Sequence, residues 1–385
     1  MSKMGLMDIQ LMGGEFTWSN NHAWSRLDIF ILSPSWESQY PNLSQKRFPR
    51  ICSDHFPIML EGGGIQGGRR PFKFENMWLK VEGFVDLIRQ WWISYSFDGN
   101  PSKILAEKLK ALKKDLKIWN EQVFGDVTSQ KKNLFQELQT LEGVGEGNHR
   151  KVQVIAELER LTLMEEISWR QKSRALWLRE RDKCTQFFHR VANAHRRFNA
   201  VESMNINVEN ISDQEVIKEH VVGHFQHLLS EPHEWRPTLD DLAFEAIDQT
   251  SRAWLERPFE EEEVHQVIKK MNKDKAPGPD GFTMAFFQFC WEVVREEVML
   301  VFHEFFMYGK FEKSLNATFI ALVPKKDGAM EVPDFRPISL GGSVYKMFSK
   351  VFAHRMSTVM EKIISKSQNA FCEGEANSRL GSYSK

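Results

Sequence analysis

Apolar side chains recur at helical spacing through the second quarter of the chain. Five of them are separated by four, three, four and three residues: Leu105, Leu109, Leu112, Leu116 and Trp119. This spacing predicts a helix with one buried apolar face. Further leucines within 134–141 continue the stripe up to a glycine-rich segment, 142–148, and a second helix is expected from about 151 to 190. Two long helices joined by a short loop predict an antiparallel helical hairpin over residues 103–200.

The first 60 residues have a different pattern. Short apolar or β-prone runs at 16–18, 27–32 and 58–60 alternate with polar turns, which is typical of short strands. The segment 61–73 that follows is rich in glycine and has the composition of a linker. We therefore expect a small β domain at 1–60, a linker, and a helical connector at 74–200.

The rest of the chain combines helices with a pair of strands. Helices are expected in three segments: 210–230, 260–272 and 283–309. Strands are expected in two segments: 317–324 and 335–340. Lys275–Gly281 contains two prolines and two glycines, so it is expected to form a sharp turn. The expected class is α+β and mostly helical, with an acidic helical region at 201–272 and a final domain at 273–385.

The charge of the chain is balanced overall but sorted along its length. The 51 Lys and Arg residues almost equal the 52 Asp and Glu residues, which argues against a uniformly basic surface. Residues 103–200 carry 20 basic and 13 acidic side chains, whereas residues 201–265 carry 4 and 16. The basic block could bind phosphates, or its cations could pair with the acidic block while its aromatic side chains form core. The candidate nucleic-acid-binding residues in it are Arg174, Arg179 and Arg181.

The cysteines and the apolar runs exclude several classes of protein. The four cysteines lie far apart and none forms a CxxC pair, so neither a zinc ribbon nor a disulfide framework is expected. No apolar run approaches ~20 residues, so no transmembrane helix is expected. The N-terminal residues lack the apolar core of a signal peptide. These features predict an intracellular protein that has no membrane partner.

A histidine between possible carboxylate partners is the first candidate for catalysis. Asp54 and His55 lie in a Ser-Asp-His tripeptide, and Asp28 lies upstream. A carboxylate that fixes the tautomer of a histidine, beside a second carboxylate that binds a metal ion, could cleave a phosphodiester. Asp28, Asp54 and His55 are therefore the candidate catalytic residues. The alternative is a turn that carries a surface histidine.

Two cations flank the expected pair of C-terminal strands. Lys325 follows the first strand, and Arg336 opens the second. Two cations placed in this way could bind one nucleoside triphosphate. The alternative is an ordinary basic loop of a hairpin.

A series of motifs resembles one protein family. The motifs are Gly14-Glu-Phe-Thr-Trp-Ser-Asn, Ser25-Arg-Leu-Asp-Ile-Phe, Cys52-Ser-Asp-His-Phe-Pro, Trp169-Arg-Gln-Lys-Ser-Arg-Ala-Leu-Trp-Leu, Phe187-Phe-His, Lys275-Ala-Pro-Gly-Pro-Asp-Gly-Phe, Leu322-Val-Pro-Lys, Phe335-Arg-Pro-Ile-Ser-Leu, Tyr345-Lys and Gln368-Asn-Ala-Phe. In this order, over roughly residues 5–374, they resemble the polyproteins of non-LTR (LINE-type) retrotransposons, most like those of plants.

The resemblance implies roles for the N-terminal residues. Residues 1–60 would be the C-terminal remnant of an endonuclease of the exonuclease–endonuclease–phosphatase type, a β-sandwich that nicks DNA with Mg²⁺. Thr17 would lie beside the phosphate, Asp28 would orient His55, and Asp54 would sit at the metal site. The family's earlier metal-binding residues have no counterpart in this chain, so no nuclease activity is expected from it.

The resemblance also implies roles for the C-terminal residues. Residues 273–385 would be the fingers of a truncated reverse transcriptase, in which Lys325 and Arg336 bind the nucleotide. The family's catalytic carboxylates would follow Gln368–Phe371, so no polymerase activity is expected from this chain. Weak, sequence-independent binding of RNA or DNA is expected instead, with a nuclear location possible. The remaining alternative is a gene product without function.

Overall fold

The structure of the chain is a computed structural model. It describes residues 6–9, 11–20, 22–33, 36, 40, 43–48, 53–62, 71–141, 149–173, 185–207, 209–231, 246–326 and 328–364, except for the side chains of 185–190, 197 and 361. Within these residues, helices and small sheets are mixed, as the predicted α+β class requires. No helix among them is long and apolar enough to cross a membrane.

The described residues between 6 and 62 form seven short strands. They are β1 (Met7–Asp8), β2 (Leu11–Met12), β3 (Trp18–Ser19), β4 (Trp24–Ser25), β5 (Ile31–Leu32), β6 (Leu43–Arg47) and β7 (Ile58–Gly62). Strand β6 pairs with β2 in parallel and with β7 in antiparallel orientation, while β1 pairs with β5 and β3 with β4. Ile9, Leu32 and Leu43 form a small core between them. Short strands were predicted here, but the run 27–32 contributes only two residues to a strand, and β6 was not predicted.

The predicted stripe of leucines is buried, but on a shorter helix than expected. After η2 (Asn76–Lys80) and α2 (Phe84–Ser94), helix α3 (Pro101–Trp119) carries the four leucines of the stripe within its span, and each is at most 3% exposed. A short π-helical turn, η3 (Asn120–Phe124), ends α3, and Gly125 follows in the left-handed region with φ of 73°. Asp126 then caps α4 (Val127–Thr140) by accepting a hydrogen bond from the backbone N–H of Ser129.

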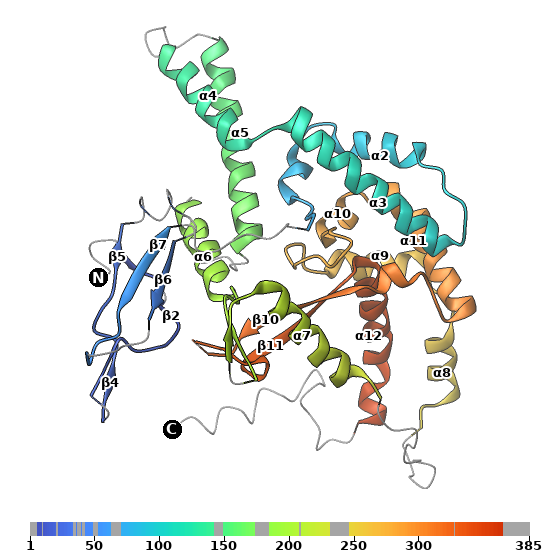
Figure 1. Ribbon diagram of the computed structural model, residues 1–385. Coiled ribbons are helices and arrows are strands. Elements are labelled where there is room, and N and C mark those ends of the chain that lie inside the picture. The colour runs from blue at the N-terminus through green and yellow to red at the C-terminus, as the bar shows by residue number, and fades with distance from the viewer. Residues whose placement is uncertain are drawn as a thin grey trace.

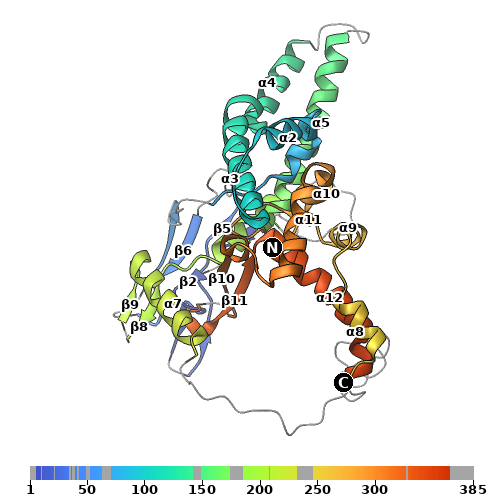
Figure 2. The same cartoon turned by 90° about the vertical axis from the view of Figure 1, so that its right-hand side faces the viewer.

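The predicted hairpin over 103–200 is therefore wrong in its extent. Helix α4 pairs with α5 (His149–Ser173), whereas α3 packs against α11 (Trp291–Tyr308). Figures 1 and 2 show α4 and α5 together as an arm that projects from the body. An ion pair of 2.5 Å between Lys131 and Glu165 joins the two helices. Helix α6 (Thr185–Phe198) comes next among the described residues. The second predicted helix, 151–190, is therefore confirmed at 151–173 and at 185–190, and its residues 174–184 lie outside the described residues.

The remaining residues form the helical body and two strand pairs. The elements are β8 (Met204–Ile206), β9 (Glu209–Ile211), α7 (Gln214–Leu229), α8 (Gln249–Glu256), α9 (Glu261–Lys270), α10 (Met284–Phe289), η4 (Lys313–Asn316), β10 (Thr318–Pro324), η5 (Val332–Asp334), β11 (Phe335–Gly341) and α12 (Ser343–Ile363). The predicted helix 283–309 is split at Cys290, between α10 and α11. One large aromatic core joins α2, α3, α9, α10, α11 and α12. In Figure 1, the antiparallel pair β10–β11 lies between the N-terminal strands and this body.

The predicted sharp turn anchors the base of β10–β11. A side chain at Gly278 would collide with the carbonyl oxygen of Gly341, so the backbones can approach only because this residue is glycine. Asp280 accepts a hydrogen bond of 2.5 Å from the backbone N–H of Ser343, at the first turn of α12. Burial raises the pKa of the Asp280 carboxyl above its ordinary value. The turn therefore fixes where β11 ends and α12 begins.

Candidate functional sites

The N-terminal strands bring Asp28 and His55 together. His55 Nδ1 lies 2.8 Å from Asp28 Oδ2, so the predicted contact between these side chains is confirmed. Thr17 fixes the backbone of Asp28, because its buried Oγ1 accepts hydrogen bonds from the backbone N–H groups of Asp28 (2.9 Å) and Leu27 (3.0 Å). In this structure Thr17 thus acts on the site through the backbone of Asp28. Its predicted contact with a phosphate stays a prediction.

The pair has the electrostatics of an oriented base. The hydrogen bond to Asp28 raises the pKa of His55 above its ordinary value, and the negative charges of Asp28 and Asp54 add to this effect. With Nδ1 facing the carboxylate, Nε2 is the nitrogen left to exchange a proton with a substrate or water. Both side chains are partly exposed, at 45% for His55 and 36% for Asp28. The arrangement is chemically suited to general acid–base work.

Asp54 is held by a residue that the sequence did not single out. Trp18 Nε1 donates a hydrogen bond of 2.7 Å to Asp54 Oδ2, and this bond is the main reason why the pKa of Asp54 lies below its ordinary value. A β-bridge between Trp18 and His55, and a bond of 2.9 Å from the backbone N–H of Ser19 to the carbonyl of Asp54, keep the segments adjacent. The contact depends on the β3–β4 turn, which sequence spacing does not reveal.

Arg47 is a second residue that sequence reasoning missed. Its guanidinium donates hydrogen bonds to the carbonyls of Gly13 (3.0 Å) and Phe16 (2.9 Å) and lies 4.2 Å from the ring centre of Phe56. A side chain at Gly14 would occupy the position of this guanidinium. Arg47 therefore fixes the loop that leads into Thr17 and Trp18. Its guanidinium also packs against Phe56, the residue that follows His55.

The described residues do not form a complete Mg²⁺ site. Mg²⁺ prefers several oxygen ligands in octahedral geometry. Among the described residues, no group of three or more His, Cys, Asp or Glu side chains could hold a metal ion. Asp54 also shares one carboxylate oxygen with the Trp18 indole. The metal role predicted for Asp54 has no supporting ligand set here.

The strand pair β10–β11 places Lys325 and Arg336 on one face. Val323 pairs with Arg336, and the backbone N–H of Lys325 donates to the carbonyl of Asp334 (2.8 Å), so the two cations are diagonal neighbours. Lys325 Nζ donates to the carbonyl of Pro333 (2.6 Å). Both side chains are exposed, and within the described part of the chain the Arg336 guanidinium makes no hydrogen bond or ion pair.

The same face of β10–β11 carries exposed apolar side chains. Phe319 is 42% exposed and Ile338 is 43% exposed. Phe319 pairs with position 340 and Ile338 with position 321, and both pairs are an even number of residues away from the pair of Val323 and Arg336. Because side chains alternate between the faces of a strand, Phe319 and Ile338 lie on the same face as Val323 and Arg336. The other face packs Leu322 and Phe335 against a core that includes Ile217 and Phe225 of α7. One face of the strand pair is thus anchored at its Leu322–Phe335 end, although Ile320 on that face is 41% exposed, and the other face presents cations and apolar groups together.

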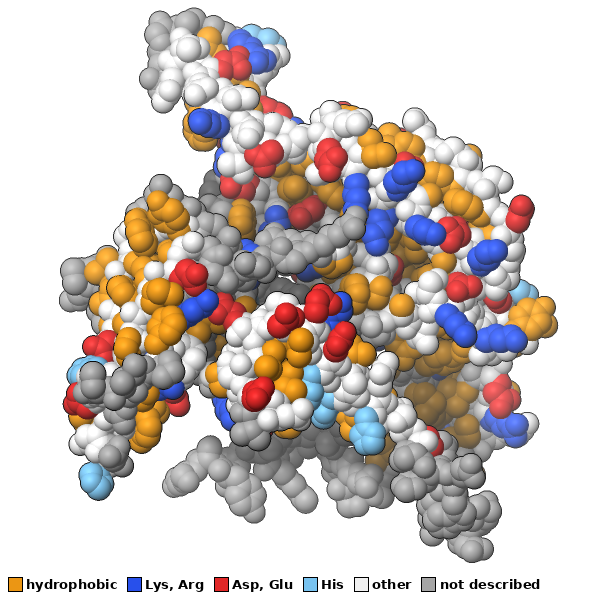
Figure 3. Space-filling view, viewed as in Figure 1, with side chains coloured by type: hydrophobic (Ala, Val, Ile, Leu, Met, Phe, Trp, Pro, Cys, Tyr) orange, Lys and Arg blue, Asp and Glu red, His pale blue; other side chains and the backbone are white. Residues whose placement is uncertain are grey.

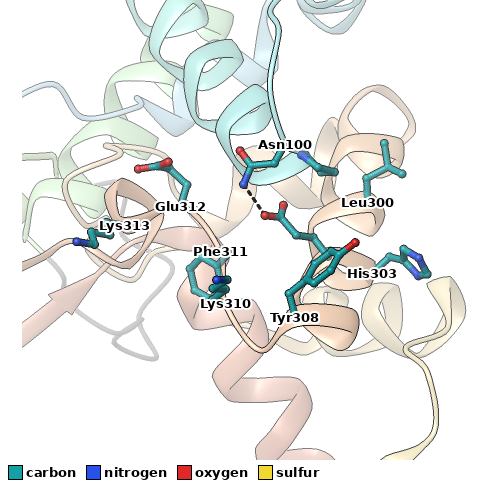
Figure 4. Close-up of a pocket in the computed structure, with 10 residues that line it drawn as sticks. Asn100, Leu300, His303, Tyr308, Lys310, Phe311, Glu312 and Lys313 are labelled. Atoms are coloured by element: carbon teal, nitrogen blue, oxygen red, sulfur yellow. Dashed lines mark hydrogen bonds between the residues drawn. The ribbon is translucent and has the colours of Figure 1, made fainter.

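Two further features lie apart from these residues. Arg174, Arg179 and Arg181, predicted to bind nucleic acid, lie outside the described residues. A cavity of about 660 Å³ lies between α3, α11 and residues 309–313. At its wall the side-chain amide of Asn100 donates a hydrogen bond of 2.6 Å to the buried carboxylate of Glu304. Figure 4 marks this bond by the dashed line at the labelled Asn100. Glu304 also accepts hydrogen bonds from Ser102, so its oxygens cap α3 and are not free for a ligand.

Comparison with known proteins finds similarity to proteins of retroelements. No protein-family model matches it. It is 25% identical over 313 residues to the Transposon TX1 uncharacterized 149 kDa protein of Xenopus laevis, covering 77% of this chain and 24% of that protein. It is 26% identical over 120 residues to the retrovirus-related Pol polyprotein from type-1 retrotransposable element R2 of Nasonia vitripennis, covering 31% of this chain and 11% of that protein.

These relatives confirm the predicted resemblance to non-LTR retrotransposon proteins. The chain spans about a quarter of the length of the first relative and about a tenth of the second. The activities and partners of the whole proteins are therefore matters of proposal for this chain. The expected likeness to plant elements stays a prediction, as do the domain boundaries.

Proposed function

We propose that this chain is a segment of a non-LTR retrotransposon polyprotein, running from the end of the endonuclease through a helical connector to the reverse transcriptase fingers. Its activity is weak binding of RNA or DNA without sequence preference, through the exposed face of β10–β11. The observation that carries the proposal is the position of Lys325 and Arg336 as diagonal neighbours on that face. Among the described residues, the Arg336 guanidinium has no hydrogen-bond or ion-pair partner.

The surface suits a single strand. A guanidinium can form two parallel hydrogen bonds with a phosphate, and a lysine adds a point charge. The exposed ring of Phe319 offers a flat surface on which a base can stack. None of these groups reads base edges, so the contacts carry no sequence information.

The salt dependence of binding tests this proposal. Full-length protein is titrated onto a fluorescent single-stranded oligonucleotide at several salt concentrations. For single strands, each neutralised phosphate contributes about 0.7 to the slope of log K against log salt. K325A and R336A should each reduce the slope by about 0.7, and R252A should leave it unchanged, because Arg252 on α8 already pairs with Glu256 at 3.0 Å.

Two outcomes of this titration contradict the proposal. Equal slopes in wild type, K325A and R336A would remove the β10–β11 face from the binding surface. A slope that falls only in the triple substitution of Arg174, Arg179 and Arg181 would move binding to the basic block.

A second candidate function is phosphodiester cleavage, favoured by the 2.8 Å contact between Asp28 and His55. The pair could take a proton from an attacking water, but the described residues supply no complete metal site. We therefore expect this chain to nick supercoiled plasmid in Mg²⁺ no faster than its H55A variant. Nicking by wild type that H55A abolishes would show that the pair is active.

A further inference from the structure

Helix α7 carries three histidines on one side. His220, His224 and His227 are spaced by four and three residues, so successive turns of the helix place them on one face. His224 and His227 are exposed and His220 is partly exposed. In Figure 3, histidine side chains gather over α7, drawn in pale blue. This cluster is not part of any motif of the retrotransposon resemblance.

The helix holds this face in a fixed position. Asp213 caps its N-terminus by accepting hydrogen bonds from the backbone N–H groups of Glu215 (2.9 Å) and Val216 (3.1 Å). Ile217 and Phe225 are buried against Val332 and Phe335, next to β10–β11. The histidines flank this buried face and are not needed for it.

The imidazole rings are available as ligands. Within the described part of the chain, no ring nitrogen of His220, His224 or His227 makes a hydrogen bond or ion pair. Side chains four residues apart on a helix have Cβ atoms about 5–6 Å apart, which lets two imidazoles reach one ion. Neutral imidazole binds Zn²⁺, Cu²⁺ and Ni²⁺, whereas Mg²⁺ and Ca²⁺ take oxygen ligands.

We propose that α7 carries a surface site for a divalent ion of the Ni²⁺, Cu²⁺ and Zn²⁺ class, with His220 and His224 as its two protein ligands. Water completes the coordination, because the described residues contain no group of three or more metal-binding side chains. A bound ion would link two turns of α7 and stabilise the helix that packs beside β10–β11. The site does not depend on the proposed nucleic-acid binding.

Calorimetric titration of untagged full-length protein with Ni²⁺ tests this site. Removing one of two protein ligands leaves a single imidazole, so H220A and H224A should each weaken Ni²⁺ binding by about tenfold or more. The matched control is H303A, which removes an exposed histidine of the α11 cavity, far in sequence from α7. Millimolar Mg²⁺ should not compete.

Electron paramagnetic resonance of the Cu²⁺ complex gives a second readout. The spectrum of wild type should show two coordinated imidazole nitrogens, and those of H220A and H224A one each. Affinity that is the same in wild type, H220A and H224A would overturn the proposal. So would a loss confined to H227A, since the assigned pair would then be wrong. Circular dichroism of each variant verifies that α7 remains folded.

Discussion

Arg355 of α12 is the residue whose substitution should damage the body most sharply. Its side chain is 3% exposed and forms two hydrogen bonds with Glu263 of α9, at 2.8 and 2.7 Å. It donates three more to the carbonyls of Leu255, Arg257 and Pro258, at 3.0, 2.7 and 3.0 Å. Arg355 thus joins α12 to α9, to the last turn of α8 and to the segment between α8 and α9.

The expected cost of R355K follows from these contacts. Burial alone would raise the pKa of Glu263, but the hydrogen bonds and charge of Arg355 bring it below its ordinary value. Lysine keeps the charge, but it has three donors in place of five. At least two of these part-buried acceptors therefore lose their bonds. An acceptor left without its donor costs about 1–3 kcal/mol, with the lower end expected where water can replace the donor. We expect R355K to lower the free energy of unfolding by about 2–4 kcal/mol.

Urea denaturation followed by circular dichroism measures this loss. The matched control is R252K, because Arg252 is an exposed arginine on α8 that pairs with Glu256 at 3.0 Å. Exposed pairs of this kind contribute about 0.3–0.5 kcal/mol. A loss in R355K no larger than that in R252K would refute the reasoning, since it would mean that these part-buried carbonyls do not need the guanidinium.

Three further predictions concern the site and the turn. D28N should lower the pKa of His55 in an NMR titration, because the hydrogen bond to Asp28 raises that pKa. Since the pKa is raised in the folded chain, the Asp28–His55 pair stabilises the fold fully at pH values below the ordinary histidine pKa. This stabilisation is lost as the pH rises through the raised pKa. G278A should cost about 1–3 kcal/mol on urea denaturation, because its Cβ meets the Gly341 carbonyl, whereas G223A in α7 has open space and should be neutral or stabilising. The chain should extend no primer in Mg²⁺ or Mn²⁺. The Asp334 carboxylate already forms an ion pair of 2.8 Å with Lys326 and accepts hydrogen bonds from two backbone N–H groups, so it is not free to bind a metal ion. Primer extension above that of a no-protein control would contradict this prediction.

Much of the helical body could be predicted from spacing alone. The leucine stripe of α3 is buried as expected, because a period of 3.6 residues states directly which face is apolar. The end of α3 was missed, although Gly125 and Asp126 are a glycine stop followed by an N-cap. The break at Cys290 has no such signal, since no glycine or proline marks it. Packing of Phe286 and Phe287 into the aromatic core accompanies it.

The N-terminal site was only half predictable. Asp28 and His55 were paired through the resemblance, and their 2.8 Å contact agrees. Trp18 and Arg47 were not foreseen, because their partners are distant in sequence and meet them only once the strands have paired. The spacing of residues in the sequence does not reveal which acceptor the indole of a tryptophan or the guanidinium of an arginine will bind. Such contacts become visible only when the register of the strands is known.

The apolar pattern of strand β10 predicts more burial than the strand pair β10–β11 has, and the exposed residues bear on the proposed function. The run Thr318–Pro324 is almost continuously apolar, which is typical of a strand buried on both faces. One face is indeed packed, through Leu322 and Phe335, but Phe319 and Ile338 on the other are 42% and 43% exposed. Apolar groups of this size, beside an Arg336 that has no partner among the described residues, are costly to leave in water and are useful under a stacked base. Part of the mismatch between pattern and burial therefore falls on the face where the proposed strand of nucleic acid would lie, and part falls on Ile320 of the opposite face, which is 41% exposed.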